Sequence, residues 1–289
     1  MSAPLAVRTP NLTLMQAPDE TSATPARVVA AKVARFQAHD VMRSRWLAAY
    51  ALFFLAATTG LLRFAGGDAR TILSLASVIL YVVPLVSIVF GTVYIYNARE
   101  FTELLLAQPV SRRGLFAGLY AGLALPLVLA MVVGVGAPFL AYGFQDSAQR
   151  VMLAALLAAG ALLTLSFTAL AFCVGLASND RLRGLGTAIG LWMLGAIVYD
   201  GIVMTLVVAF SSHPLERPLL ALTLANPIDL ARVALLLQLD VSALMGYTGA
   251  VFQQFLGGAT GTLVAGAALA LWVLVPLALG LRTFTRKDF

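Results

Sequence analysis

The chain is poor in the residues on which catalysis and metal binding usually depend. Only 11% of its 289 residues are charged, against about 25% in soluble globular proteins. Its single cysteine, Cys173, excludes an intrachain disulfide and any cysteine-based zinc or cluster site. It has two histidines, and no G-x-x-x-x-G-K-[ST] loop that would hold a nucleotide phosphate. The chain is therefore not expected to be an enzyme, and any ATP-driven role requires a separate subunit.

Hydrophobic residues, in contrast, make up 61% of the chain, and the mean hydropathy is +0.92. Six apolar segments are each long enough to cross about 30 Å of hydrocarbon at 1.5 Å per residue. We therefore expect an all-α polytopic membrane protein with one transmembrane domain over residues 46–281. The expected spans are 46–64, 72–96, 114–143, 151–177, 185–210 and 259–281. The third contains Pro126 and Pro138, which predict a kink or a break.

The region before the first span divides into two parts. Residues 1–27 contain four prolines among small and polar residues, so we expect a disordered tail. In residues 28–45, Val29, Val33 and Phe36 share one helical side while Lys32 and Arg35 point elsewhere. This pattern predicts an amphipathic helix on the membrane surface.

The placement of lysine and arginine predicts the orientation. Fourteen of the nineteen basic residues lie in the two termini and in the connections on the same side as the termini. By the positive-inside rule both termini, including residues 282–289, are cytoplasmic and the protein belongs to the inner membrane. A net charge of +6 placed beside the spans indicates topology and not nucleic-acid binding. The five basic residues assigned to the outer side are Arg63, Arg70, Arg150, Arg217 and Arg232.

Two connections are longer than turns. The inner one, residues 97–113, reads NAREFTELLLAQPVSRR and predicts a short cytoplasmic amphipathic helix that ends at Pro109. The outer one, residues 211–258, contains ANPIDLARVALLLQLD, in which Asn226 or Asp229 could cap a helix. Its apolar positions would dip into the outer interface or pack on the spans. Further along, Tyr247, Phe252 and Phe255 stand among glycines and glutamines, a mixture that suits contact with a periplasmic protein.

One acid, Asp200, lies well within an apolar span. Ionisable residues inside a membrane are costly and are functional candidates by default. The simpler interpretation is a packing role, with a hydrogen bond to a neighbouring hydroxyl or backbone group or a position close to the outer interface. Glycines repeat every fourth residue at 114, 118 and 122, and again at 186 and 190, which favours close helix packing.

The order of these elements resembles the permease subunits of type-2 ABC exporters, the ABC-2 superfamily, over nearly all of residues 28–289. The resemblance implies that the inner helix is the coupling helix that docks on a cytoplasmic ABC ATPase dimer. The chain itself would bind no cofactor, and ATP and Mg would belong to the ATPase. The residues that match this element are Glu100, Glu103, Leu104, Leu105, Pro109, Arg112 and Arg113.

A narrower resemblance concerns the outer run from Ala225 to Gly257. It is similar to the permeases of the system that matures nitrous oxide reductase. This resemblance implies a homodimeric permease that works with the ATPase and with a periplasmic repeat protein. The complex would support assembly of the copper-sulfide centre, by exporting a sulfur species or by transmitting force across the bilayer.

Other functions stay open at this stage. The chain is also compatible with an ABC-2 permease for a different substrate, or with a membrane anchor that only transmits a conformational signal. A proton-coupled secondary transporter with Asp200 as the proton carrier is a third possibility, although the inverted repeats typical of that class are not evident.

Overall fold

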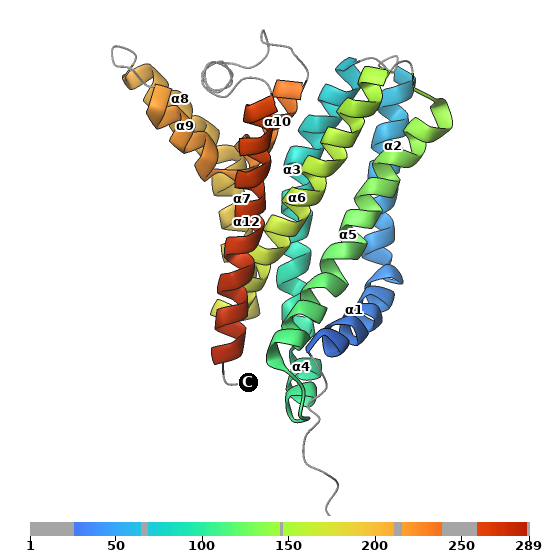
Figure 1. Cartoon of the computed structure of the whole chain (residues 1–289), viewed down its shortest axis with the longest axis vertical. Helices are drawn as coiled ribbons and strands as arrows, with labels where there is room; N and C mark the ends of the chain where they lie inside the picture. Colours follow the sequence, from blue (N-terminus) through green and yellow to red (C-terminus); the bar gives the residue numbers. More distant parts are fainter. Residues whose placement is uncertain (1–25, 65–68, 145–146, 211–215, 239–258, 288–289) are drawn as a thin grey trace, which may run out of the picture.

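The computed structural model describes residues 26–64, 69–144, 147–210, 216–238 and 259–287, and within these ranges all regular structure is helical. Figure 1 shows a bundle of long helices with the short helix α4 (Arg99–Leu106) at one end, which we call the α4 end. The prediction of an all-α polytopic membrane protein is confirmed.

Six stretches of the described chain are long and apolar enough to cross a bilayer, which confirms the predicted number of spans. The first four belong to α2 (Arg45–Phe64), α3 (Ala69–Asn97), α5 (Arg112–Tyr142) and α6 (Ser147–Ala177). The fifth is continuous through α7 (Arg181–Met193), the π-helix η1 (Leu194–Val198) and α8 (Tyr199–Ala209), and the sixth is α12 (Ala259–Arg286). Pro126 and Pro138 both lie inside α5, which runs through them without a break.

A glycine stripe on α5 receives the N-terminal helix α1 (Ala26–Met42). A Cβ added to Gly118 would lie 2.7 Å from Cβ of Val33, and one added to Gly122 would lie 2.6 Å from Cβ of Gln37. Only glycine therefore lets the two backbones approach this closely. The predicted surface helix is packed along the third span. A Cβ on Gly186 or Gly190, in contrast, would meet nothing within 4 Å, so the second glycine repeat makes no close packing with the described part of the chain.

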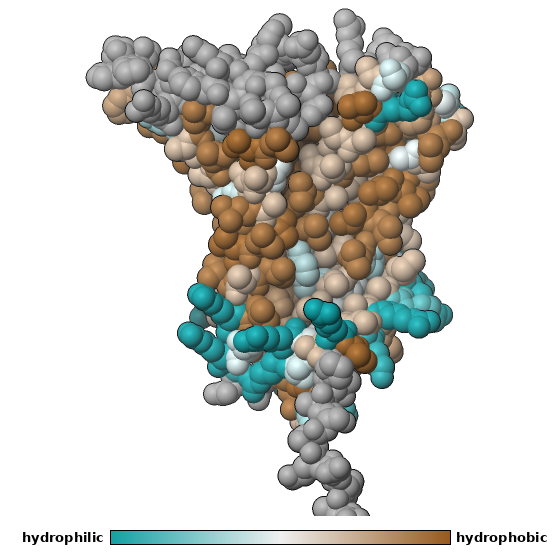
Figure 2. All heavy atoms as spheres, in the orientation of Figure 1, coloured by the Kyte–Doolittle hydropathy of each residue, from teal (hydrophilic) through white to brown (hydrophobic). Residues whose placement is uncertain are grey.

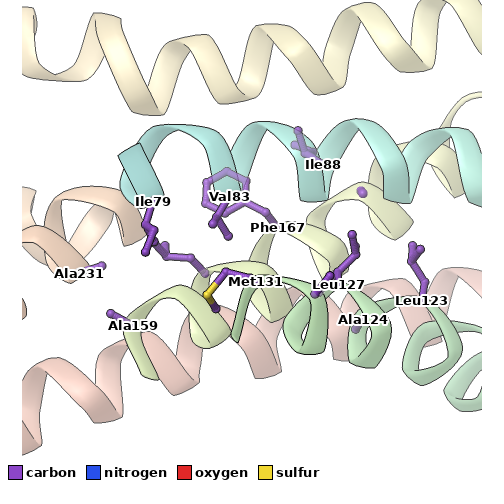
Figure 3. Packing of buried hydrophobic residues seen from close by; sticks show 14 of the residues in the cluster. Ile79, Val83, Ile88, Leu123, Ala124, Leu127, Met131, Ala159, Phe167 and Ala231 are labelled. Atoms are coloured by element: carbon purple, nitrogen blue, oxygen red, sulfur yellow. The ribbon is translucent and has the colours of Figure 1, made fainter. Parts of the chain in front are cut away.

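The core lies where α3, α5 and α6 meet (Figure 3). Ile79 and Val83 on α3, Leu127 and Met131 on α5, and Phe167 on α6 are at most 3% exposed. Such interdigitated packing, rather than hydrophobicity alone, holds helices together in lipid. Most large side chains on the outer surface are apolar, and Figure 2 shows a broad hydrophobic belt with hydrophilic residues gathered at the α4 end.

The part of residues 211–258 that the structure describes is a bent helix pair. Helices α9 (Glu216–Ala225) and α10 (Pro227–Gln238) meet at an angle of 109°. The sequence leaves open whether the apolar positions of this region dip into the outer interface or pack on the spans. In the structure they pack on the spans: α10 contacts α3, α6 and α12, and its Leu230 and Ala231 are fully buried. Helix α8 ends, and α12 begins, at the end of the bundle opposite α4 (Figure 1). Helix α12 then returns to the α4 end, where Lys287 bonds to Asn179. The α9–α10 pair therefore begins and ends on the same side of the bundle, as a re-entrant segment does.

Candidate functional site

An ion-pair cluster joins the α9–α10 pair to the second and fifth spans. Nη1 of Arg232, on α10, lies 3.2 and 3.1 Å from the two carboxylate oxygens of Asp200 and 3.3 Å from Oδ1 of Asp229. Its Nη2 donates to the hydroxyl of Tyr81, on α3, at 3.1 Å. The guanidinium also lies over the Tyr81 ring, with 6.0 Å between Cζ and the ring centre. One cation thus holds two acids and a phenol from three parts of the fold.

The cluster lies toward the end of the fifth span that is farther from the α4 end. Asp200 follows Arg181, the start of the fifth span, by 19 residues, which corresponds to about 28 Å of helix. The side chains of Asp200, Arg232 and Asp229 are 41%, 29% and 9% exposed, so Asp229 is the most enclosed. An unpaired charge at such a place would cost several kcal/mol, and pairing offsets that cost only when the hydrogen bonds are well formed. Arg232 faces both acids with Nη1, while its Nη2 donates to Tyr81.

Asn226, the residue between α9 and α10, performs two tasks beside this cluster. Its Oδ1 accepts a hydrogen bond from the backbone N–H of Ile228 at 3.0 Å and so caps α10. Its Nδ2 donates to the carbonyl of Gly195 at 2.7 Å, within the π-helix η1. Single π-helical turns are rare inside α-helices and often occur at functional sites. The helix bend of the re-entrant pair is therefore fixed directly onto the irregular turn that precedes Asp200.

Aromatic side chains attach the same pair to the spans. Nε1 of Trp272, on α12, donates to the carbonyl of Leu224 at 3.0 Å, and the hydroxyl of Tyr199 donates to the carbonyl of Leu222. Both carbonyls belong to the last turn of α9, where a helix leaves its C=O groups without intrahelical partners. Hydrogen bonds from the fifth and sixth spans thus hold the α9–α10 bend in addition to the ion pairs of Arg232.

The sequence predicts a hydrogen bond from Asp200 to a neighbouring hydroxyl or backbone group. The partner in the structure is instead the charged side chain of Arg232. The sequence assigned Arg232 to the outer side as a topology marker, and the structure places it against Asp200. Asp229 was considered only as a helix cap; the capping side chain is Asn226, and Asp229 binds Arg232. Tyr81 gave no signal in the sequence, because one tyrosine in a long apolar run is typical of ordinary packing.

The predicted coupling helix, α4, presents a mixed face. Glu100, Glu103 and Leu104 are exposed, with Leu104 at 71%, whereas Leu105 is half-buried. Phe101 lies against α1, where its ring stacks on Phe36 at 5.9 Å. Positions 100, 103 and 104 follow the spacing of one helical side, so the exposed face is continuous. The connection that follows adds exposed Pro109, and Arg113, in the first turn of α5, is exposed as well.

The connection between α6 and α7 joins the start of α4 to the end of α12. Oδ1 of Asn179 accepts bonds from Nη2 of Arg99, at the start of α4, and from Nζ of Lys287 at 2.9 and 3.1 Å. The side chain of Asp180 caps α7 through the N–H of Leu182 at 2.9 Å. Burial and the nearby Arg99 guanidinium lower the pKa of Lys287. The start of the fifth span therefore shares this connection with α4.

Arg112 has partners within the chain itself. Its Nη1 donates to the carbonyls of Thr285 and Lys287 at 3.1 and 3.0 Å, which ties the end of α12 to the beginning of α5. Of the two arginines that the resemblance places at the ATPase contact, Arg113 is the exposed one. The predicted periplasmic contacts, Tyr247, Phe252 and Phe255, lie outside the residues that the structure describes.

These features describe a multi-pass helical membrane protein. A family model described as "ABC-2 family transporter protein" matches residues 9–289, and the chain belongs to that family. Among curated proteins it is 28% identical over 271 residues to the "Probable ABC transporter permease protein NosY" of Pseudomonas aeruginosa, and 29% identical over 283 residues to the protein of the same name from Stutzerimonas stutzeri. Each match covers 88% of this chain and 97% of the relative.

Proposed function

We propose that the chain is the membrane permease of an ABC exporter that supports assembly of the copper-sulfide centre of nitrous oxide reductase. Two copies would span the inner membrane, with both termini in the cytoplasm, and bind a dimeric ATPase that supplies ATP and Mg. The cargo would be a sulfur-containing species, or the complex would transmit force to a periplasmic repeat protein. The similarity to two NosY permeases over nearly their full length is the observation that supports this choice of system.

The exposed face of α4 is the contact that we assign to the ATPase. It combines the two acids Glu100 and Glu103 with the uncovered Leu104, and it lies at the end of the molecule where hydrophilic residues gather (Figure 2). An apolar anchor surrounded by charges is the usual composition of a protein contact. Motion of this face would reach the fifth span through Arg99 and the Asn179 side chain.

The fifth span has the properties of a moving part in this mechanism. Only 6% of its most apolar window is buried within the chain, compared with 50% for α6. At its start, the hydroxyl of Tyr96 on α3 bonds to the carbonyls of Ser178 and Asp180, and near its middle Nε1 of Trp192 donates to the carbonyl of Tyr81. Beyond its middle, Arg232 and Asn226 attach it to the α9–α10 pair. A displacement of α4 would therefore shift this span and, through Arg232, the α9–α10 pair that leads to residues 239–258.

ATPase docking is tested by reversing charges on α4. The double variant Glu100→Lys/Glu103→Lys should reach the membrane in normal amounts but lose an ABC-type ATPase on affinity purification. Arg150→Glu, an exposed reversal at the opposite end of the bundle, is the control and should retain the ATPase. Equal copurification by both variants would place the docking surface elsewhere.

The system is tested by the product that it is proposed to mature. Reductase isolated from a strain that lacks the chain should contain much less sulfide at its copper centre, and the wild-type gene should restore the sulfide. A normal sulfide content in the deletion strain would refute this assignment and leave an ABC-2 permease for another substrate.

The periplasmic contact has its own experiment. Replacing Tyr247 and Phe252 with alanine should weaken retention of the periplasmic partner and leave ATPase binding unchanged. If the partner and reductase maturation are both unaffected, these aromatic residues do not form the contact.

A further inference from the structure

A cavity of about 830 Å³ lies near the α4 end, separate from the Asp200 cluster. Its walls come from α1, α3, α5 and the beginning of α2, and α4 contributes Phe101. A volume of this size is within the range of pockets that hold small organic ligands.

The interior of the cavity is apolar. Leu123 and Leu127 from α5 are 3% and 0% exposed and form its inner wall together with Val89, Phe90 and Val93 from α3. These side chains offer no hydrogen bonds. They suit a hydrocarbon chain, and water in contact with them would gain nothing.

Opposite charges stand at the mouth. Asp40, near the end of α1, and Arg181, at the start of α7, line the cavity and are both exposed. Neither forms an ion pair within the described chain. Trp46, 72% exposed, lines the same opening, and tryptophan is typical of the level at which lipid headgroups lie. The cavity thus has a cation site, an anion site and an apolar interior.

We propose that this cavity binds one phospholipid that carries an ammonium headgroup, such as phosphatidylethanolamine. The ammonium lies at Asp40, the phosphate at Arg181, and part of an acyl chain between α3 and α5. A phospholipid held here would fill the space between α1 and the spans, beside the helix that we assign to the ATPase. It would act as a structural part of that end of the permease.

The first experiment counts retained lipid. The full-length permease, purified with its copurifying subunits, is exchanged through detergent with an equimolar supply of phosphatidylethanolamine and phosphatidylglycerol of identical acyl chains, and bound lipid is quantified by mass spectrometry. We expect about one phosphatidylethanolamine per chain, lost in Val93→Phe, which fills the cavity, and kept in Val133→Phe, an equal substitution on the exposed side of α5. Equal retention by the two variants, or no retained lipid in the wild type, would overturn the proposal.

The polar contacts are tested separately. Asp40→Asn should reduce the preference for phosphatidylethanolamine over phosphatidylglycerol about threefold, the size of one exposed ion pair. An unchanged headgroup preference would refute the ammonium site. This result does not depend on whether the permease serves nitrous oxide reductase.

Discussion

Removing Arg232 should destabilise the permease more than removing Asp200, although the two residues are partners. Arg232→Gln leaves both Asp200 and the enclosed Asp229 without a cation, and an uncompensated buried charge costs about 3–5 kcal/mol. In Asp200→Asn the guanidinium keeps Asp229 and Tyr81, and the amide oxygen still accepts a hydrogen bond. Because the Asp200 side chain is 41% exposed, we expect a loss of only about 1–2 kcal/mol.

Thermal unfolding in one fixed detergent, followed by tryptophan fluorescence, measures this difference. At about 2–4 °C per kcal/mol, Arg232→Gln should lower the Tm by at least about 6 °C and Asp200→Asn by a few degrees. The neutral triple variant Arg232→Gln/Asp200→Asn/Asp229→Asn should be more stable than Arg232→Gln alone, because no charge is left without a partner. The reasoning fails if the two single variants lose equal stability or if the triple variant gives no recovery.

The same variants test what Asp200 does. Asparagine keeps the shape of the side chain and cannot carry a proton, so Asp200→Asn should retain most activity, whereas Asp200→Leu should lose it together with the contact to Arg232. Reductase maturation and ATP hydrolysis by the purified complex are the readouts. An Asp200→Asn variant that assembles and hydrolyses ATP but does not function would favour the proton-carrier hypothesis.

The remaining predictions concern packing and topology. Gly118→Ala should cost about 1–3 kcal/mol in thermal unfolding because its Cβ would lie 2.7 Å from Val33, while Gly186→Ala, with nothing within 4 Å, should cause no loss; equal effects would contradict the close crossing of α1 and α5. In a background without Cys173, an impermeant thiol reagent applied from outside should label a cysteine at Arg150 and not one at Gln108. The reverse pattern would invert the predicted orientation.

The sequence predicts the spans well because each depends on a sum over many residues. About twenty apolar residues are needed to cross hydrocarbon, so one polar position changes little, and the six expected segments overlap the six observed ones. The α5 glycine repeat is predictive for the same reason, since it recurs along a face. The repeat at Gly186 and Gly190 has the same pattern but no close neighbour among the described residues. Glycine spacing indicates that a close approach is possible and cannot identify the partner helix.

The Asp200 cluster could be predicted only in part, because it depends on a pairing between two segments. Counting basic residues treats each arginine outside a span as a loop residue, and Arg232 was counted in this way. Its own surroundings indicate otherwise: it stands in ARVALLL, an apolar helix in which a lone guanidinium would itself be costly. An acid inside one span and an arginine inside a nearby apolar run present the same physical requirement with opposite signs. Each of the two residues needs a partner of opposite charge within the membrane, and the other one can supply it. This requirement predicts the ion pair, and with it the return of α9 and α10 toward the spans.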